Sequence, residues 1–348
     1  MKAIAGLNLE ELEQLLSPLP RFRASQIQKW IIKGAAGFDE MTNIPAAMQK
    51  ELSQRFSIFS SVISCCHEDG QTKKIVLSLE DGAQIEAVLL SDGKKRLTAC
   101  LSTQAGCPAG CVFCKTGSIG FKRNLESYEI AEQFLHLQAL IKNNSRRKEE
   151  EKTQNVIDNI VIMGMGEPFL NLDNLRKAIS VLTCPKGINL SRRRITVSTC
   201  GIYNGLADFA KNGPFVRLAL SLTTADEPLR GKLMPVTKTN PLKKIKETLL
   251  LFQNNGGGRI TLELPLLGGI NTRDIDAKSI ADFSAGLDCV VNIIPWNPVA
   301  GLSFEGKQLR EPDKKEITDF IRILESYNLK VTTHSPRFFQ GLKNSSKL

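Results

Sequence analysis

The first part of the chain carries a helical pattern of apolar positions. Apolar residues of the segment 8–16 fall on one face of a helix, and Asn8 is suited to cap its N-terminus. The same period predicts a second helix from Ala24 and a third helix after Pro45. We therefore predict a small helical accessory domain over residues 1–57.

The period of the pattern shortens to two in the next part. Residues 74–79 and 84–90 are strand-like, and they flank Asp81-Gly82, which is a strong hairpin turn signal. These features predict an antiparallel β extension of three or four strands over residues 58–96.

Strands and helices then alternate over residues 97–300, which is typical of βα units around a parallel sheet. The predicted strands lie near 98–103, 159–163, 194–199, 215–222, 259–264 and 288–294, with helices near 126–142, 172–182, 204–211, 241–254 and 273–284. Six such units suit an α/β fold with an incomplete parallel barrel, whose chemistry belongs at the C-terminal strand ends. A final helix near 313–326 and a strand near 329–333 fall in the remaining segment, 301–348.

Composition narrows the class of protein. The 348 residues allow one barrel-like domain with an appendage, and no stretch is long and apolar enough to span a bilayer. The N-terminus lacks the apolar region of a signal peptide, so we expect a cytoplasmic protein without a membrane partner. The nine cysteines are an odd number, which argues against a pure disulfide framework. A net charge of +10 predicts attraction to a polyanion such as RNA, although charge alone does not identify the partner.

Three cysteines form the main chemical motif. Cys107, Cys111 and Cys114 follow the spacing C-x3-C-x2-C in a loop between a predicted strand and a predicted helix. Three thiolates suit a [4Fe-4S] cluster with one open iron better than a zinc site, which takes a fourth ligand, histidine or carboxylate. Three buried structural cysteines are the alternative, but their density within eight residues disfavours it.

This spacing, with Phe113 before the third cysteine, resembles the signature of the radical S-adenosylmethionine (SAM) enzymes. The longer strings 100–107 and 116–125 are similar to the RlmN/Cfr family of RNA adenine methyltransferases. Members of that family methylate 23S rRNA and, in some cases, tRNA. The resemblance runs from about Arg21 to about Thr332 and therefore covers most of the chain.

The resemblance implies a fold, two cofactors and several partners. The fold is an incomplete parallel (β/α)6 radical SAM barrel with an N-terminal helical accessory domain and a small antiparallel β extension. The cofactors are a [4Fe-4S] cluster on Cys107, Cys111 and Cys114, and SAM on the open iron. The expected partners are rRNA or tRNA and an electron donor such as flavodoxin or ferredoxin, and we expect a monomer. Residues 23–30 resemble the accessory domain that helps to hold RNA, and a packing role without ligand contact stays open.

The resemblance also implies a SAM site at successive strand ends. Met163-Gly-Met-Gly166-Glu167 follows the second barrel strand, where glycines allow close approach and Glu167 can accept a hydrogen bond from the methionine ammonium. The positions that match the family's SAM site are Gly166, Glu167, Ser198, Ser221, Leu222, Thr223 and Asn297. Thr223 departs from the family pattern, which has histidine or asparagine there.

Two further positions match catalytic residues of the family. Glu86 corresponds to the proton acceptor, and Cys100, seven residues before Cys107, corresponds to the resolving cysteine. From chemistry alone, Glu86 on an alternating strand would face water and Cys100 would be a buried strand thiol.

One departure concerns the methyl carrier. Family members have a cysteine in a C-terminal loop that first receives the methyl group from SAM. Here no cysteine follows Cys289, and alignment on Gly341-Leu342 places Gln340, which cannot act as a sulfur nucleophile, at the carrier position. Cys200 is the best-placed substitute, and we expect SAM cleavage with little or no methyladenosine. An RNA methyltransferase, a radical SAM enzyme that has lost methyl transfer, and an RNA-binding protein without turnover all stay open.

Overall fold

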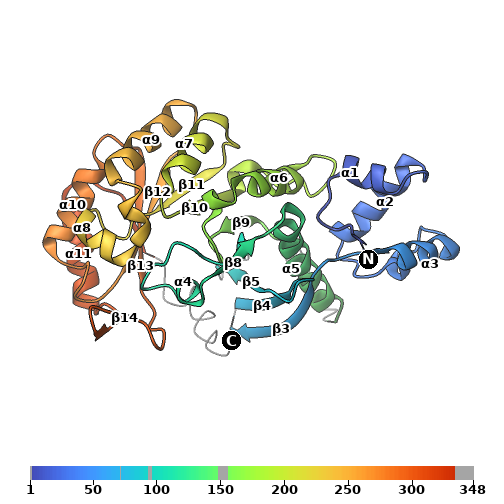
Figure 1. The fold of residues 1–348 in the computed structure, drawn as a ribbon, viewed down its shortest axis with the longest axis horizontal. Helices are drawn as coiled ribbons and strands as arrows, with labels where there is room; N and C mark the ends of the chain where they lie inside the picture. Colours follow the sequence, from blue (N-terminus) through green and yellow to red (C-terminus); the bar gives the residue numbers. More distant parts are fainter. Residues whose placement is uncertain (1, 71, 93–95, 148–155, 334–348) are drawn as a thin grey trace. The chain divides into compact units, whose positions relative to one another are not determined.

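The computed structural model describes residues 2–70, 72–92, 96–147 and 156–333 (Figure 1). The chain divides into two compact units, each built from three separate segments. The first unit contains the residues up to 105, residues 124–164 and residues 173–194, and the second contains residues 106–123, residues 165–172 and the chain from 195 onward. The predicted domains are contiguous stretches whereas these units are interleaved, so the domain boundaries stay a prediction.

The N-terminal part of the first unit is helical, as predicted. Asn8 caps α1 (Leu9–Leu15), because its Oδ1 accepts from the Glu11 amide at 2.9 Å while the Glu11 carboxylate accepts from the Asn8 amide at 2.9 Å. Leu12, Ile27 and Leu52, one from each of the three helices, are buried. The elements are β1 (Lys2–Ala3), α1 (Leu9–Leu15), α2 (Arg21–Ile32), η1 (Phe38–Glu40), α3 (Ala46–Arg55) and β2 (Phe56–Ser57), with β1 parallel to β2.

The predicted antiparallel extension is a four-stranded ladder in the first unit. Its strands are β3 (Val62–Asp69), β4 (Thr72–Ser78), β5 (Gln84–Ser91) and β6 (Leu97–Cys100), and β9 (Asn159–Ile162) continues the sheet parallel to β6. The predicted turn lies between β4 and β5, where Gly82 has a φ of +77° and the Asp81 side chain accepts from the Ala83 amide. Helices α5 (Ser127–Arg147) and α6 (Leu172–Thr183) follow the predicted pattern.

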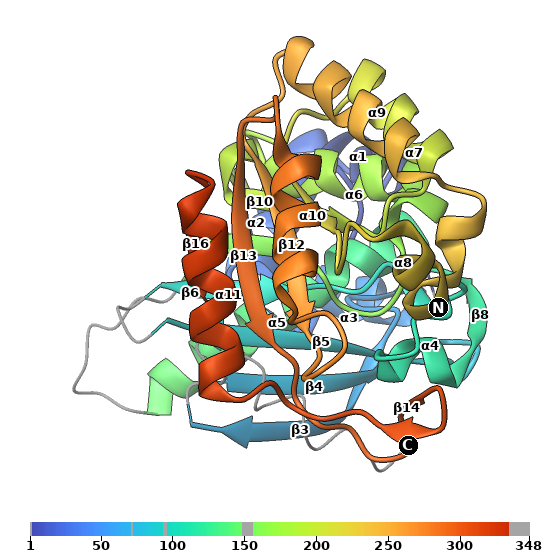
Figure 2. The ribbon, with the colours of Figure 1, turned by 90° about the vertical axis from the view of Figure 1, so that its left-hand side faces the viewer.

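The second unit contains a parallel sheet covered by helices. Its strands, in spatial order, are β10 (Ile195–Thr199), β11 (Arg217–Ser221), β12 (Ile260–Leu266), β13 (Cys289–Pro295) and β16 (Val331–Thr333). Its long helices are α7 (Tyr203–Asn212), α9 (Leu242–Asn254), α10 (Asp274–Ser284) and α11 (Lys314–Ser326). Helix α7 packs beside α9 and α10 beside α11 (Figure 2). Because all five strands run the same way, their C-terminal ends share one edge, where parallel α/β folds place chemistry.

Several short elements were not predicted from the sequence, because they contain too few residues to show a periodic pattern of apolar positions. They are β7 (Gln104–Gly106), α4 (Lys115–Ile119), β8 (Phe121–Asn124), η2 (Pro168–Leu170), η3 (Arg192–Arg194), α8 (Glu227–Leu233), η4 (Pro235–Lys238), β14 (Ser303–Phe304) and β15 (Lys307–Gln308). In the part of the chain that the structure describes, no helix combines the length and the apolar character needed to cross a membrane.

Candidate active site at the strand ends

The three cysteines lie on a tightly folded loop of the second unit. The Cys107 amide donates to the Gly120 carbonyl at 3.0 Å, and the Cys114 amide donates to the Cys111 carbonyl at 3.1 Å. Gly106 has a φ of +80°, and a Cβ there would lie 1.8 Å from the Gly120 oxygen, so only glycine fits. The sequence therefore closes this loop through backbone contacts.

The thiols are close enough to influence one another electrostatically. Burial raises the pKa of Cys107 to about 11, with a smaller contribution from Cys114. Burial also raises the pKa of Cys111, and the neighbouring Cys114 and Cys107 add to the shift. Loading with a metal centre would therefore release thiol protons.

The donor set fits an iron–sulfur cluster. Among the described residues, no three or more histidine, cysteine, aspartate or glutamate side chains converge to hold a single metal ion. A [4Fe-4S] cluster instead takes one cysteine on each of several irons, so its ligands are neighbours that need not share one point. Three half-buried thiols, Cys107, Cys111 and Cys114, meet that requirement.

Glu167 lies beside this loop in the second unit and is 3% exposed. Its Oε1 accepts from the Thr199 hydroxyl at 2.7 Å and from the Phe169 amide at 3.0 Å, and its Oε2 accepts from the Cys200 amide at 2.7 Å. Burial raises the pKa of Glu167, while these hydrogen bonds act in the opposite direction. Glu167 thus ties the end of β10 to the Gly166 turn, whose φ is +105°.

The predicted SAM positions of β10, β11 and β13 gather at the shared strand ends. The hydroxyls of Ser198 and Ser221 lie 3.1 Å apart. Thr223 Oγ1 and Asn297 Oδ1 are buried, and neither has a hydrogen-bond partner among the described residues. Buried polar atoms are almost always paired, so two orphan atoms at one edge indicate a polar ligand. This observation fits SAM, which offers an amine, a carboxylate and ribose hydroxyls.

Arg230 on α8 is a residue that the sequence prediction missed. Its side chain is fully buried and donates to the Leu222 carbonyl at 2.9 Å, the Cys200 carbonyl at 2.7 Å and the Thr237 hydroxyl at 2.7 Å. Burial lowers the pKa of Arg230, which the nearby thiols and carboxylates partly offset. An arginine in a short polar helix usually faces solvent, so the sequence carries no signal for this role.

Glu86 and Cys100 come together in the first unit, on the adjacent strands β5 and β6. Glu86 forms an ion pair with the buried Lys74 at 3.1 Å, and its backbone carbonyl accepts from the Ser102 hydroxyl at 2.6 Å. Burial raises the pKa of Cys100 to about 12, with Glu86 adding to the shift. The structure therefore groups the cluster cysteines with the SAM positions, and Glu86 with Cys100.

The candidate substitute carrier, Cys200, lies in the core. It is 6% exposed and belongs to the same apolar cluster as Leu233 and Met234. Burial raises its pKa well above the ordinary thiol value, which makes it a weak nucleophile. Gln340 and Gly341, on which the carrier alignment rests, lie outside the described residues.

Two family profiles match the chain. The profile of the radical SAM superfamily matches residues 101–278, which hold the three cysteines and three of the five strands of the second unit, β10, β11 and β12. The profile described as the ribosomal RNA large subunit methyltransferase N-terminal domain matches residues 3–58. The fold and the site together define a radical SAM enzyme.

Named relatives identify the family within the radical SAM superfamily more closely. A protein of Treponema denticola, named "Probable dual-specificity RNA methyltransferase RlmN", is 47% identical over 96% of this chain and 92% of its own length. A protein of Treponema pallidum with the same name is 40% identical over 96% of this chain and 94% of its own. The crystal structure of a radical SAM methyltransferase from Sphaerobacter thermophilus is 32% identical with a TM-score of 0.86, covering 96% of this chain and 95% of that one.

The chain belongs to the RlmN family of radical SAM methyltransferases. It is therefore an enzyme whose cofactors are a [4Fe-4S] cluster and SAM, and the fold class predicted from the sequence is confirmed. The relatives favour the methyltransferase over the two alternatives raised by the sequence, SAM cleavage without methyl transfer and RNA binding without turnover.

Proposed function

We propose that this enzyme methylates adenine in RNA, with 23S rRNA and tRNA as substrates. The name that these relatives carry, dual-specificity RNA methyltransferase, supports RNA as the substrate class. The net charge of +10 favours the same partner. We further propose that residues 1–57 help to hold the RNA.

In this proposal Cys107, Cys111 and Cys114 hold the cluster, which when bound supplies the electron for reductive cleavage of SAM. Gly166 gives the ligand close access to the backbone, and Glu167 retains lone pairs for the methionine ammonium. The remaining SAM contacts come from Ser198, Ser221, Leu222, Thr223 and Asn297. The observation that carries the proposal is the pair of orphan atoms, Thr223 Oγ1 and Asn297 Oδ1, in the unit that holds the three thiols.

Glu86 and Cys100 take the two remaining roles. Glu86, as an ion-paired carboxylate, can accept the adenine ring proton, and Lys74 keeps that carboxylate in place. Cys100 is the resolving thiol. Its burial keeps the thiol protonated at neutral pH before it reacts. We also expect a cytoplasmic monomer that draws electrons from flavodoxin or ferredoxin.

The test is a product analysis. Anaerobically reconstituted protein is incubated with SAM, a reductant and total RNA, and digested nucleosides are measured by mass spectrometry. The sequence alone predicted little or no methyladenosine, but because the relatives are named RNA methyltransferases we now expect 2- or 8-methyladenosine together with 5′-deoxyadenosine. A variant with alanine at Cys107, Cys111 and Cys114 should bind no iron and make neither product, whereas Cys184→Ala, outside the motif, should behave as the wild type.

The same experiment separates the alternatives. Formation of 5′-deoxyadenosine without methyladenosine would reject methyl transfer and support the enzyme that only cleaves SAM. Because no cysteine follows Cys289 in residues 1–348, peptide mass spectrometry should accompany the assay and locate any methylated thiol. Methylation at Cys200, lost in Cys200→Ala together with methyladenosine, would identify it as the carrier.

A further inference from the structure

Thr223 has an unusual backbone for its residue type. Its φ is +64°, in the left-handed region that β-branched residues rarely adopt, and its side chain is fully buried. Its amide donates to the Glu263 carbonyl at 3.2 Å, and this carbonyl also accepts from the Leu222 amide at 3.0 Å. Such a conformation persists only where the surroundings hold it in place.

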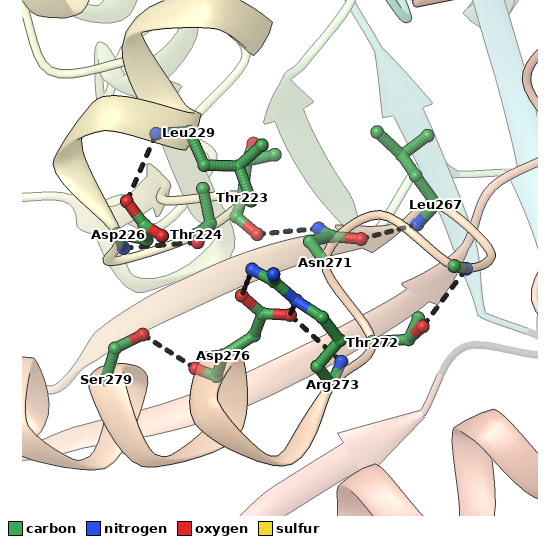
Figure 3. Close-up of polar contacts among 11 residues, drawn as sticks. Thr223, Thr224, Asp226, Leu229, Leu267, Asn271, Thr272, Arg273, Asp276 and Ser279 are labelled. Carbon is green, nitrogen blue, oxygen red and sulfur yellow. Dashed lines mark hydrogen bonds and ion pairs between the residues drawn. The ribbon is translucent and has the colours of Figure 1, made fainter. Parts of the chain in front are cut away.

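Asn271 supplies the restraint on the other side of this residue (Figure 3). Its Nδ2 donates to the Thr223 carbonyl at 2.8 Å and to the Pro265 carbonyl at 2.9 Å, and its Oδ1 accepts from the Leu267 amide at 2.7 Å. Asn271 is 1% exposed. One buried amide therefore joins the loop after β11 to the end of β12 and to the turn that follows it.

The neighbouring elements have restraints of their own. Helix α8 is capped by Asp226, whose carboxylate accepts from the Leu229 amide at 3.1 Å. Helix α10 is capped by Asp276, whose carboxylate accepts from the Arg273 amide at 2.9 Å. Strands β11 and β12 are joined by their own ladder, ending at Ser221 and Glu263. Among the described residues, the bond that acts directly on the Thr223 carbonyl is therefore the one from Asn271. The neighbouring helices and strands are held by other bonds.

We propose that Asn271 is a positioning residue for SAM, which holds Thr223 in its left-handed conformation before the ligand arrives. This inference rests on the proposed function, because it takes Thr223 Oγ1 as a contact of SAM. A preformed contact spares the ligand the entropic cost of ordering the loop, so Asn271 acts on affinity without touching SAM. At saturating SAM the loop is ordered in every molecule, so the rate of SAM cleavage should be unaffected.

The principal variant is Asn271→Asp. The carboxylate still accepts from the Leu267 amide, but both donors to Thr223 and Pro265 are lost. The matched control is Asn240→Asp at another buried amide, 8% exposed, which donates to the Val236 carbonyl at 2.7 Å and accepts from the Tyr203 amide at 2.7 Å. Asn271→Ala removes the amide without adding charge. It replaces Asn271→Asp in the experiment if the aspartate variant does not fold.

Two quantities are measured: the unfolding temperature of each metal-free protein, and the Kd for SAM of each reconstituted protein by equilibrium dialysis. We expect both aspartate variants to unfold at lower temperature, but only Asn271→Asp or Asn271→Ala to weaken SAM binding, by tenfold or more. The KM for SAM should rise in parallel, with kcat within twofold of the wild type.

Two results would overturn the inference while leaving the proposed function intact. One is a wild-type Kd in the Asn271 variants, and the other is an equal loss of affinity in Asn240→Asp, which would mark a general effect of destabilisation. Failure of the reconstituted wild type to bind SAM would instead reject the proposed function and this inference together.

Discussion

At the scale of single residues, Thr223 shows how a pocket position can conflict with backbone preference. A β-branched residue at a φ of +64° is strained, whereas asparagine tolerates that region because its short amide can bond locally. We therefore expect Thr223→Asn to raise the free energy of unfolding of the metal-free protein by about 0.5–1 kcal/mol, measured by urea denaturation.

Thr261 provides the control for this prediction. It lies in strand β12, and it is not among the residues with positive φ, so Thr261→Asn loses strand preference without relieving strain. That variant should be less stable than the wild type. Equal destabilisation of both variants would contradict the assignment of strain to Thr223.

A second residue-scale prediction concerns Glu263 in strand β12. Burial raises its pKa from 4.5 to about 7, although Asn292 donates to it at 2.7 Å. The native state therefore binds the proton more tightly than the unfolded chain, so this carboxyl's contribution to stability is complete below pH 4.5 and is lost as pH rises to about 7. Relative to Glu263→Gln, the wild type should lose on the order of 3 kcal/mol across that window.

Urea denaturation of both proteins from pH 4.5 to 8 provides the measurement. Glu316→Gln is the contrast, because Arg310 lowers the pKa of Glu316 to about 2 and the resulting pH dependence lies below pH 4.5. Parallel profiles for the wild type and Glu263→Gln would show that Glu263 is already ionised in the native state.

At the scale of elements, sequence patterns predicted what is long and periodic. The strand β12 and the helix α9 were found because apolar residues repeat along them and pack into a core. The cysteine spacing likewise predicted the loop, because its three cysteines lie within eight consecutive residues. The roles of Arg230 and Asn271 could not be predicted, because their partners are backbone carbonyls brought close only by the folded strand ends.

Helix α8 therefore contributes more to stability than its length suggests. Arg230→Met removes the donor to the Cys200 carbonyl and one of two donors to the Leu222 carbonyl, which keeps the Thr224 amide at 2.7 Å. We expect a loss of about 2–4 kcal/mol in the free energy of unfolding of the metal-free protein, by chemical denaturation. Arg322→Met on the exposed face of α11 should change it by less than about 0.5 kcal/mol. Similar small effects in both variants would refute a structural role for Arg230.

At the scale of the whole molecule, the positive charge predicts how RNA affinity responds to salt. Each phosphate contact releases counterions, so the logarithm of the binding constant should fall linearly with the logarithm of salt concentration. Arg192 and Arg193 are exposed on η3, whereas Arg194 pairs with Asp158 at 3.3 Å. We expect Arg192→Gln with Arg193→Gln to lower the slope by about 1–2, measured by filter binding between 50 and 200 mM salt.

Arg322→Gln, which removes one exposed charge from α11, is the control and should leave the slope nearly unchanged. An affinity that does not vary with salt would argue against RNA as the partner. A slope that is steep but unchanged in the double variant would place the phosphate contacts on other residues.

The interleaving of the two units has a consequence for synthesis on the ribosome. The cysteine loop 106–123 belongs to the unit that is completed only when the strands from β10 onward have been made. At roughly 5–20 residues per second, the nascent chain carries this loop without its partners for on the order of ten seconds or more. During that interval the three thiols are open to oxidation and to stray metal ions. By contrast, residues 3–58, matched by their own profile, form one continuous stretch that is synthesised before the cysteine loop.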